Sequence, residues 1–167
     1  VATYAGEIED AKEVVRNNPD DADAHYGLGL EYGVLGKYKE AIEAFRQAIR
    51  IDPDNADAHY GLGVVYGNLG MQKEEIESYK QAIRIDPDYA DAHFNLGAAY
   101  GYLGMQKEAI ESFKQAIRID PDYADAHFNL GLAYLFLNDR GSALEQYKIL
   151  KKLDTEMANE LFNSIYK

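Results

Sequence analysis

Apolar and small side chains recur along this chain at the spacing of amphipathic helices. In residues 56–89 they form two sets, each with intervals that place its members on one helix face. The first set is Ala58, Leu62, Val65, Tyr66 and Leu69, and the second is Ile76, Tyr79, Ala82, Ile83 and Ile85. Gly70 follows the first set, where glycine commonly ends a helix, and Pro87 follows the second, where a helix cannot continue. Residues 56–89 are therefore predicted to form a helix hairpin.

The same pattern repeats every 34 residues, because the sequence Ala-Asp-Ala-His begins at Ala22, Ala56, Ala90 and Ala124. A fixed period in this range is typical of a solenoid, in which each unit buries its apolar face by stacking on its neighbours. We therefore predict that residues 1–167 form one all-α domain. Its four hairpins are expected at residues 22–55, 56–89, 90–123 and 124–154.

Both ends of the chain depart from the repeat. Residues 4–18 have the pattern of a single helix, whose apolar face would hold Tyr4, Ile8, Ala11 and Val15. Residues 155–167 have one more apolar stripe, made of Met157, Leu161, Phe162 and Ile165. Solenoids need atypical ends that cover their terminal repeats. We expect residues 155–167 to be a capping helix, and residues 4–18 to be either a capping helix or a half-repeat.

The charge balance restricts the class of partner. The chain has 17 Lys and Arg residues against 29 Asp and Glu residues, a formal net charge of −12. This charge repels nucleic acid and anionic membranes and favours a basic or apolar partner. No apolar run reaches the roughly 18–20 residues that a membrane span requires. We therefore expect a protein or peptide partner, no nucleic acid and no membrane span.

Two further features bear on the chemistry and the location of the chain. The sequence contains no cysteine, which excludes disulfides, thiolate catalysis and Cys-based zinc sites. The chain begins at Val1 rather than at Met, so we expect that an upstream segment, with any targeting signal, has been removed. The compartment is therefore left open.

The repeated residues resemble those of the tetratricopeptide repeat (TPR) proteins. The first hairpin carries the pattern Leu28, Gly29, Tyr32, Gly36, Ala41, Phe45, Ala48 and Pro53. The next two hairpins follow it closely, and the fourth has Asn138, Leu150 and Thr155 where Gly, Ala and Pro are usual. The resemblance implies a right-handed superhelix of helix hairpins, in which the first helix of each hairpin lines a concave groove and the second forms the convex back. It also implies a scaffold for protein–protein interaction.

Some positions depart from the family pattern or mark the start of a helix. Histidines stand where Trp is often found, at His25, His59, His93 and His127. We expect them to pack between helices with one ring nitrogen hydrogen-bonded. Glu75 takes a place that usually holds Ala, and it should loosen the second hairpin unless its carboxylate reaches solvent. Asp88 is predicted to cap the next helix.

The resemblance also implies which residues would contact a ligand. Some TPR proteins hold a peptide backbone with a ladder of asparagines, whose amides both donate and accept hydrogen bonds. Asn95 and Asn129 are similar to this ladder, and Gly27 and Gly61 replace its first two members. The residues predicted to contact a peptide are Asp91, Phe94, Asn95, Tyr102, Asp125, Phe128, Asn129 and Phe136, together with Tyr26, Tyr60 and Asn68.

These positions carry no Lys or Arg, so the groove is not expected to bind the carboxylate of a chain terminus. Its aromatic and aliphatic floor with a row of aspartates suits an extended or helical segment that has apolar anchors and basic flanks. Two simpler interpretations remain. The aspartates favour the positive ends of the helix dipoles, and the aromatic rings pack between adjacent first helices.

No catalytic, metal or cofactor site is predicted. The histidines recur once per hairpin, roughly 10 Å apart, whereas Zn–N bonds are about 2.0–2.1 Å. Asp57 and His59 are two residues apart, so they do not face each other on a helix, and no nucleophile accompanies them. We therefore predict that the chain is not an enzyme and needs no cofactor.

Two alternatives to peptide binding stay open at this point. Contacts through the terminal repeats would build a self-assembling scaffold, and hence a homo-oligomer. The chain would otherwise be the TPR targeting arm of a larger enzyme.

Overall fold

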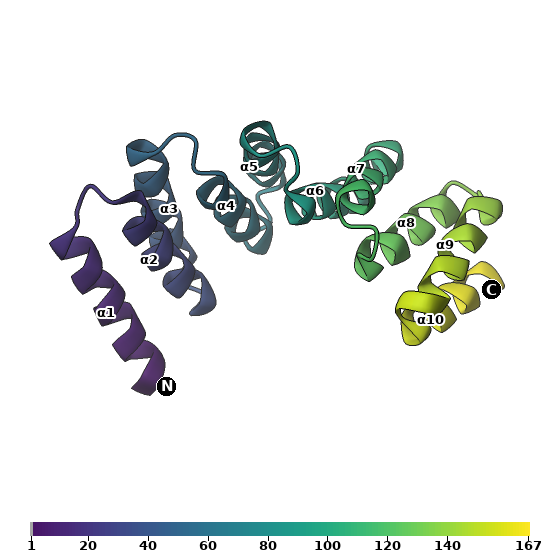
Figure 1. Ribbon diagram of the computed structural model, residues 1–167, viewed down its shortest axis with the longest axis horizontal. Helices are drawn as coiled ribbons and strands as arrows, with labels where there is room; N and C mark the ends of the chain where they lie inside the picture. Colours follow the sequence, from purple (N-terminus) through teal and green to yellow (C-terminus); the bar gives the residue numbers. More distant parts are fainter. Residues whose placement is uncertain (1) are drawn as a thin grey trace. The chain divides into compact units, whose positions relative to one another are not determined.

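The computed structural model describes the backbone of residues 2–167 and the side chains of residues 6–167. These residues form helices joined by short turns, with no strand among them, as Figure 1 shows. The predicted all-α fold is confirmed. The helices are α1 (Ala2–Asn17), α2 (Ala22–Val34), α3 (Tyr38–Ile51), α4 (Ala56–Asn68), α5 (Gln72–Ile85), α6 (Ala90–Tyr102), α7 (Gln106–Ile119), α8 (Ala124–Phe136), α9 (Arg140–Leu153) and α10 (Thr155–Ile165).

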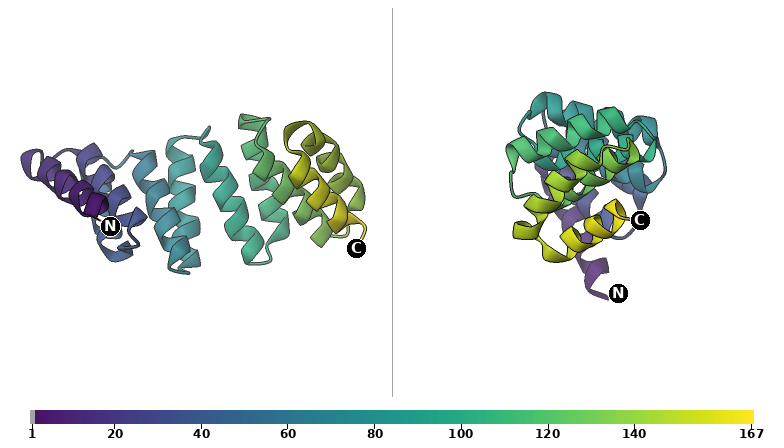
Figure 2. Two further views of the ribbon diagram at one scale, coloured as in Figure 1. Left: turned by 90° about the horizontal axis from the view of Figure 1, so that it is seen from below. Right: turned by 90° about the vertical axis from the view of Figure 1, so that its right-hand side faces the viewer.

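The helices belong to two compact units. The N-terminal unit, Val1–Pro87, contains α1–α5, and the C-terminal unit, Asp88–Lys167, contains α6–α10. Within each unit, consecutive helices pack side by side (Figure 2). We call α2, α4, α6 and α8 the first helices, and α3, α5, α7 and α9 the second helices. In the N-terminal unit α2 contacts both α3 and α4, and in the C-terminal unit α6 contacts both α7 and α8.

A residue with positive φ follows each first helix. Gly36, Gly70 and Gly104 have φ between 69° and 74°, and Asn138 has φ of 61° in the fourth hairpin. Only glycine adopts this left-handed conformation at little cost, and asparagine tolerates it better than most residues. The prediction that Gly70 follows the end of the first helix is confirmed, since α4 ends at Asn68.

The starts of the first helices are capped in different ways. The carboxylate of Asp21 accepts a hydrogen bond from the Asp23 amide at 3.0 Å, and the side chain of Asn55 accepts one from the Ala58 amide at 2.8 Å. Tyr89 holds the equivalent place before α6 and makes no side-chain cap. The prediction that Asp88 caps α6 is wrong, because Tyr89 separates it from the helix and its carboxylate accepts instead from Arg118 Nη2 at 3.1 Å.

The core of the N-terminal unit lies between α3 and α4. Ala41 and Phe45 of α3 are buried against Leu62, Val65 and Tyr66 of α4. The Phe45 ring lies between glycines of two first helices, since a Cβ atom added at Gly29 or at Gly61 would lie 2.6 or 2.7 Å from it. The absence of side chains at these two glycines therefore lets α2 and α4 approach the same ring.

The C-terminal unit has one core between α7 and α8 and another beneath α10. The first buries Ala109, Ile110, Phe113, Leu130 and Ala133. The second buries Ala143, Leu150, Ala158, Leu161 and Ile165. Because α10 contacts both α8 and α9, its apolar stripe completes the packing of the fourth hairpin. Within residues 2–167, each helix is too short or too polar to span a lipid bilayer.

Candidate functional site

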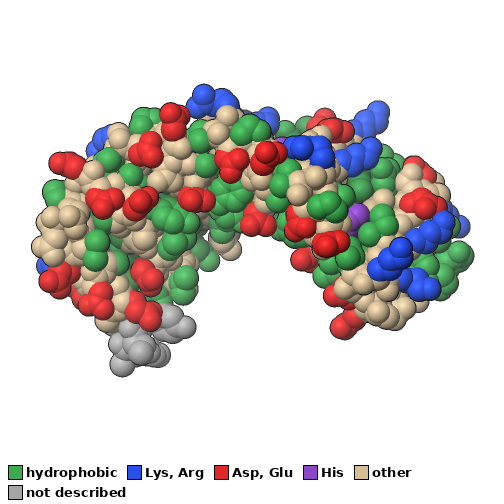
Figure 3. All heavy atoms as spheres, in the orientation of Figure 1, with side chains coloured by type: hydrophobic (Ala, Val, Ile, Leu, Met, Phe, Trp, Pro, Cys, Tyr) green, Lys and Arg blue, Asp and Glu red, His purple; other side chains and the backbone are tan. Residues whose placement is uncertain are grey.

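The first helices carry apolar side chains that are exposed to solvent. In the N-terminal unit they are Leu30 and Val34 on α2 and Val64 on α4, and in the C-terminal unit they are Tyr102 on α6 and Phe136 on α8. We call these residues and the helix faces that carry them the first-helix surface of each unit. Figure 3 shows hydrophobic side chains gathered over α2 and α4.

The most exposed of these side chains stand at one position of the repeat. Val34 is 69% exposed, Tyr102 is 81% exposed and Phe136 is 67% exposed, and Asn68 takes the same place in the second hairpin. Large apolar groups left in water contribute little to folding, and gathered on one face they mark an interaction site. Tyr102 and Phe136 are therefore the exposed aromatic residues among the predicted contacts.

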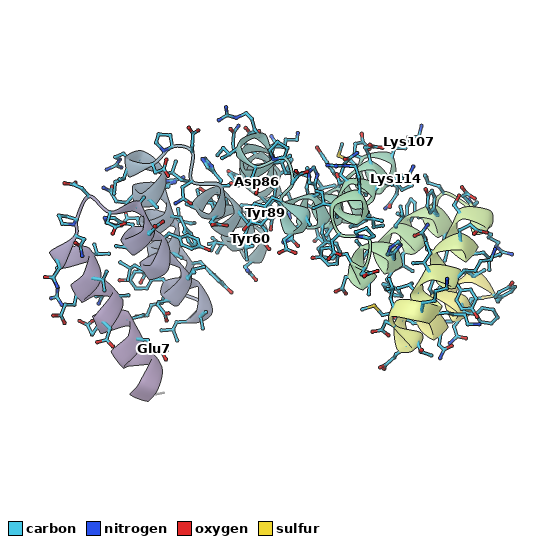
Figure 4. The ribbon with its side chains drawn as sticks, in the orientation of Figure 1. Glu7, Tyr60, Asp86, Tyr89, Lys107 and Lys114 are labelled. Atoms are coloured by element: carbon cyan, nitrogen blue, oxygen red, sulfur yellow. The ribbon has the colours of Figure 1, made fainter. Side chains whose placement is uncertain are left out.

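The other predicted aromatic residues pack within their hairpins. Tyr26, Tyr60 and Phe94 each lie with the ring centroid 5.8 Å from a ring of the following second helix, and all three are half-buried. Tyr60 is labelled on α4 in Figure 4. Phe128 is partly buried against the core beneath α10. The packing interpretation therefore accounts for much of the position of these rings.

Two of the three predicted asparagines donate a hydrogen bond within their own helix. Asn129 Nδ2 donates to the Asp125 carbonyl oxygen at 2.8 Å, and Asn68 Nδ2 donates to the Val64 carbonyl oxygen at 2.9 Å. Both bonds lie within the residue's own helix and leave Oδ1 as an acceptor. Asn95 on α6 is half-buried. Because α6 contacts α8, Asn95 and Asn129 come from neighbouring helices of one unit.

The two glycines that replace asparagine in the first hairpins have different surroundings. A Cβ atom at Gly27 would meet no other atom within 4 Å, whereas one at Gly61 would meet the buried Phe45 ring. Gly27 therefore leaves open space on α2. Gly61 instead serves the packing of α3 against α4.

The predicted aspartates lie in the first turns of their helices, Asp91 in α6 and Asp125 in α8. There they favour the positive end of the helix dipole, as the simpler interpretation expects. Asp91 Oδ1 also accepts a hydrogen bond from the Tyr123 hydroxyl at 2.7 Å. Both side chains belong to exposed residues, so they still present negative charge beside the first-helix surface.

The histidines hold the turns that precede the first helices. The Nε2 atoms of His25, His59 and His127 lie 2.8, 3.2 and 2.9 Å from the carbonyl oxygens of Pro19, Pro53 and Pro121. In His127, which is buried, Nδ1 also lies 2.7 Å from Gln146 Oε1. The expected hydrogen bond of a ring nitrogen is confirmed for these three histidines. The described residues contain no group of three His, Asp or Glu side chains arranged to hold a metal ion.

Glu75 belongs to the site, although it is not among the predicted contact residues. Its side chain extends from α5 to the backbone of α4, where a Cβ atom at Gly67 would lie 2.8 Å from Glu75 Oε1. The residue is half-buried, and this burial raises the pKa of its carboxyl group above the ordinary value. Leu30, Val34 and Val64 lie on the same face as Tyr26 and Tyr60, as their helical spacing indicates.

Comparisons with known proteins agree with this architecture. A family model described as TPR repeat matches residues 30–70, 74–104 and 102–137, and one described as tetratricopeptide repeat matches residues 124–156. A search of curated proteins with this sequence gave no match.

Solved structures share the fold over most of the chain. A crystal structure of MamA is 28% identical, with a TM-score of 0.84, over 93% of this chain and 91% of that one. YrrB, described as a TPR protein with an unusual peptide-binding site, is 27% identical, with a TM-score of 0.78, over 97% of this chain and 84% of that one. A thermophilic TPR protein from Thermus thermophilus, TTC0263, is 24% identical, with a TM-score of 0.74, over 98% of this chain and 91% of that one.

Proposed function

Because the chain belongs to the tetratricopeptide repeat family, we propose that it binds an extended or helical peptide segment along its first helices, without catalysing a reaction. Proteins of this family are generally non-catalytic scaffolds that bind protein or peptide partners. The bound segment would place apolar anchors on the first-helix surface and basic residues beside them.

The observation that carries this proposal is the exposure of Tyr102 and Phe136 on neighbouring helices. A large ring anchors a bound segment when it becomes buried in the complex, and aromatic residues are enriched among those that dominate binding energy. Tyr102 and Phe136 are set apart from Phe94, whose ring is already packed against Phe113. They are therefore available to a partner, whereas the Phe94 ring is engaged within its own hairpin.

Charge favours basic flanks on the partner. The first helices contain Asp23, Glu31, Asp57, Asp91 and Asp125 but no Lys or Arg. The net charge of −12 extends this preference over the whole chain and would speed association with a basic segment. YrrB, one of the similar structures, is described as having a peptide-binding site, which supports the same class of ligand.

The asparagines supply the backbone contacts of the proposed complex. An Asn amide pairs with a peptide N–H or C=O whatever the side chain, so it contributes affinity without selecting a sequence. We expect the double variant Asn95→Ala with Asn129→Ala to weaken binding by about tenfold, as two lost hydrogen bonds of modest net strength imply.

The test is a selection of random 12-residue peptides on the full chain, followed by fluorescence polarisation with the selected peptide. Lys107→Ala is the matched control, because Lys107 is exposed on α7, a second helix, as Figure 4 shows. Circular dichroism should show that both variants keep their helices. Equal affinity of the selected peptide for the double variant and for the control would contradict the proposal.

A further inference from the structure

We infer that Glu75 is a binding site for one positively charged side chain, Arg or Lys, of a segment lying on the first-helix surface of the N-terminal unit. The inference rests on the proposed function for the class of ligand. It adds a residue that recognises a single charge within that ligand.

The place of Glu75 in the repeat is otherwise filled by a methyl group. Ala41, Ala109 and Ala143 occupy it in the other hairpins, and each is 0% exposed. Because alanine at this position is fully buried in the other hairpins, the longer Glu75 side chain must extend past that buried position. The second hairpin therefore has a charged group at this position, between α5 and α4.

The carboxylate emerges at Gly67. A Cβ atom added at Gly67 would lie 2.8 Å from Glu75 Oε1. At the equivalent Gly33 a Cβ atom would meet nothing within 4 Å, and at Gly101 it would meet only the Ala109 methyl at 4.0 Å. The carboxylate thus fills space that the first and third hairpins leave open. Gly67 lies three residues after Val64 and seven after Tyr60, so all three share one face of α4.

No group within the described residues pairs with this carboxylate. Its oxygens make no hydrogen bond or ion pair there, and neither α2 nor α4 contains a Lys or Arg. Lys73 and Lys80 of α5 lie two and five residues away, spacings that do not place them on the same helix face as Glu75. Burial raises the pKa of the Glu75 carboxyl, although the residue lies in the first turn of α5, where the helix dipole favours a negative charge.

An external cation would supply the missing partner. A carboxylate accepts charge-assisted hydrogen bonds from a guanidinium or ammonium group, and such bonds gain strength where water is partly excluded. Guanidinium suits the site especially well because its planar donors pair with both carboxylate oxygens. A ligand arginine at Gly67 would have its apolar neighbours beside Tyr60 and Val64.

The test uses ethylguanidinium chloride as the probe and N-ethylurea, its neutral counterpart, as the reference. Amide NMR spectra of the full chain are recorded during titration with each compound. We expect the Gly67 and Glu75 resonances to shift saturably with ethylguanidinium and not with N-ethylurea. In Glu75→Ala the shift of Gly67 should be lost or its midpoint raised by about tenfold, as for a lost charged hydrogen bond.

Glu74→Ala is the matched control, because it removes the same charge from an exposed residue of the same helix. It should leave the Gly67 titration unchanged. Equal Gly67 shifts in wild type and Glu75→Ala, or no saturable shift in the wild type, would overturn the inference. Since the probe needs no peptide, this failure is distinguishable from a failure of peptide binding.

Discussion

The glycines of α2 show how neighbouring residues in one helix serve different purposes. Gly29 is required by packing, because the Phe45 ring occupies the space of its missing side chain. Gly27, two residues earlier, has no atom within 4 Å of a Cβ position and faces open space. From the sequence, both glycines are expected to lie inside a helix. Only the position of Phe45 shows which one the fold needs.

This difference predicts opposite effects of the same substitution. Gly27→Ala should raise the free energy of unfolding by about 0.5–1 kcal/mol, because alanine favours the helix interior and no clash arises. Gly29→Ala should lower it by about 1–3 kcal/mol, because the new methyl overpacks the core. Urea unfolding followed by circular dichroism measures both, and a loss of stability in Gly27→Ala would contradict the environment described for α2.

Glu75 gives a second prediction at this scale. Glu75→Ala should raise the free energy of unfolding by about 1 kcal/mol at pH 7, since it removes a partly buried, unpaired carboxylate and restores the alanine of the other hairpins. Folding raises the pKa of this carboxyl above 4.5, so its cost is present at neutral pH and falls as the group becomes protonated. The gain should therefore shrink as the pH falls toward 4.5.

Glu74→Ala serves as the control for this measurement, because it accounts for the general preference of helices for alanine. Urea unfolding at several pH values compares the two variants. A gain in Glu75→Ala that grows on acidification would show that burial of the carboxylate is not its cause.

At the scale of elements, the helix pattern was predictable because apolar spacing and turn residues agree. Gly70 and Pro87 follow helices as predicted, and the positive φ of Gly36, Gly70 and Gly104 explains why glycine recurs there. The capping of α6 was not predictable from local sequence. Asp88 has the right residue type, but its carboxylate is bound by Arg118, thirty residues away along the chain.

The fourth hairpin offers a test of the turns between paired helices. Asn138 has a φ of 61° in the place of the glycines of the other hairpins, so Asn138→Gly should raise the free energy of unfolding by about 0.5 kcal/mol. The reciprocal change, Gly104→Asn, should lower it by a similar amount. Thermal unfolding of both variants measures the effect, and equal destabilisation by both changes would show that backbone conformation does not govern these turns.

At the scale of the whole molecule, the repeat predicts the fold far better than the contact residues. Period, helix pattern and family resemblance agree because all depend on the packing residues that every hairpin shares. The predicted contacts were less uniform: Tyr102 and Phe136 are exposed, whereas Tyr26, Tyr60 and Phe94 have rings that pack within their hairpins. A repeat sequence places both kinds of residue on the first helices. It does not show how deeply each ring is buried.

The central claim is that partners bind along the first helices, and an NMR footprint of the selected peptide tests it most directly. Amide chemical shifts of the full chain are compared with and without the peptide. We predict that the largest changes fall in the first helices of a unit, α2 and α4 or α6 and α8, and that changes in α6 and α8 lie near Tyr102 and Phe136. Changes confined to the second helices, or to α1 and α10, would contradict this claim.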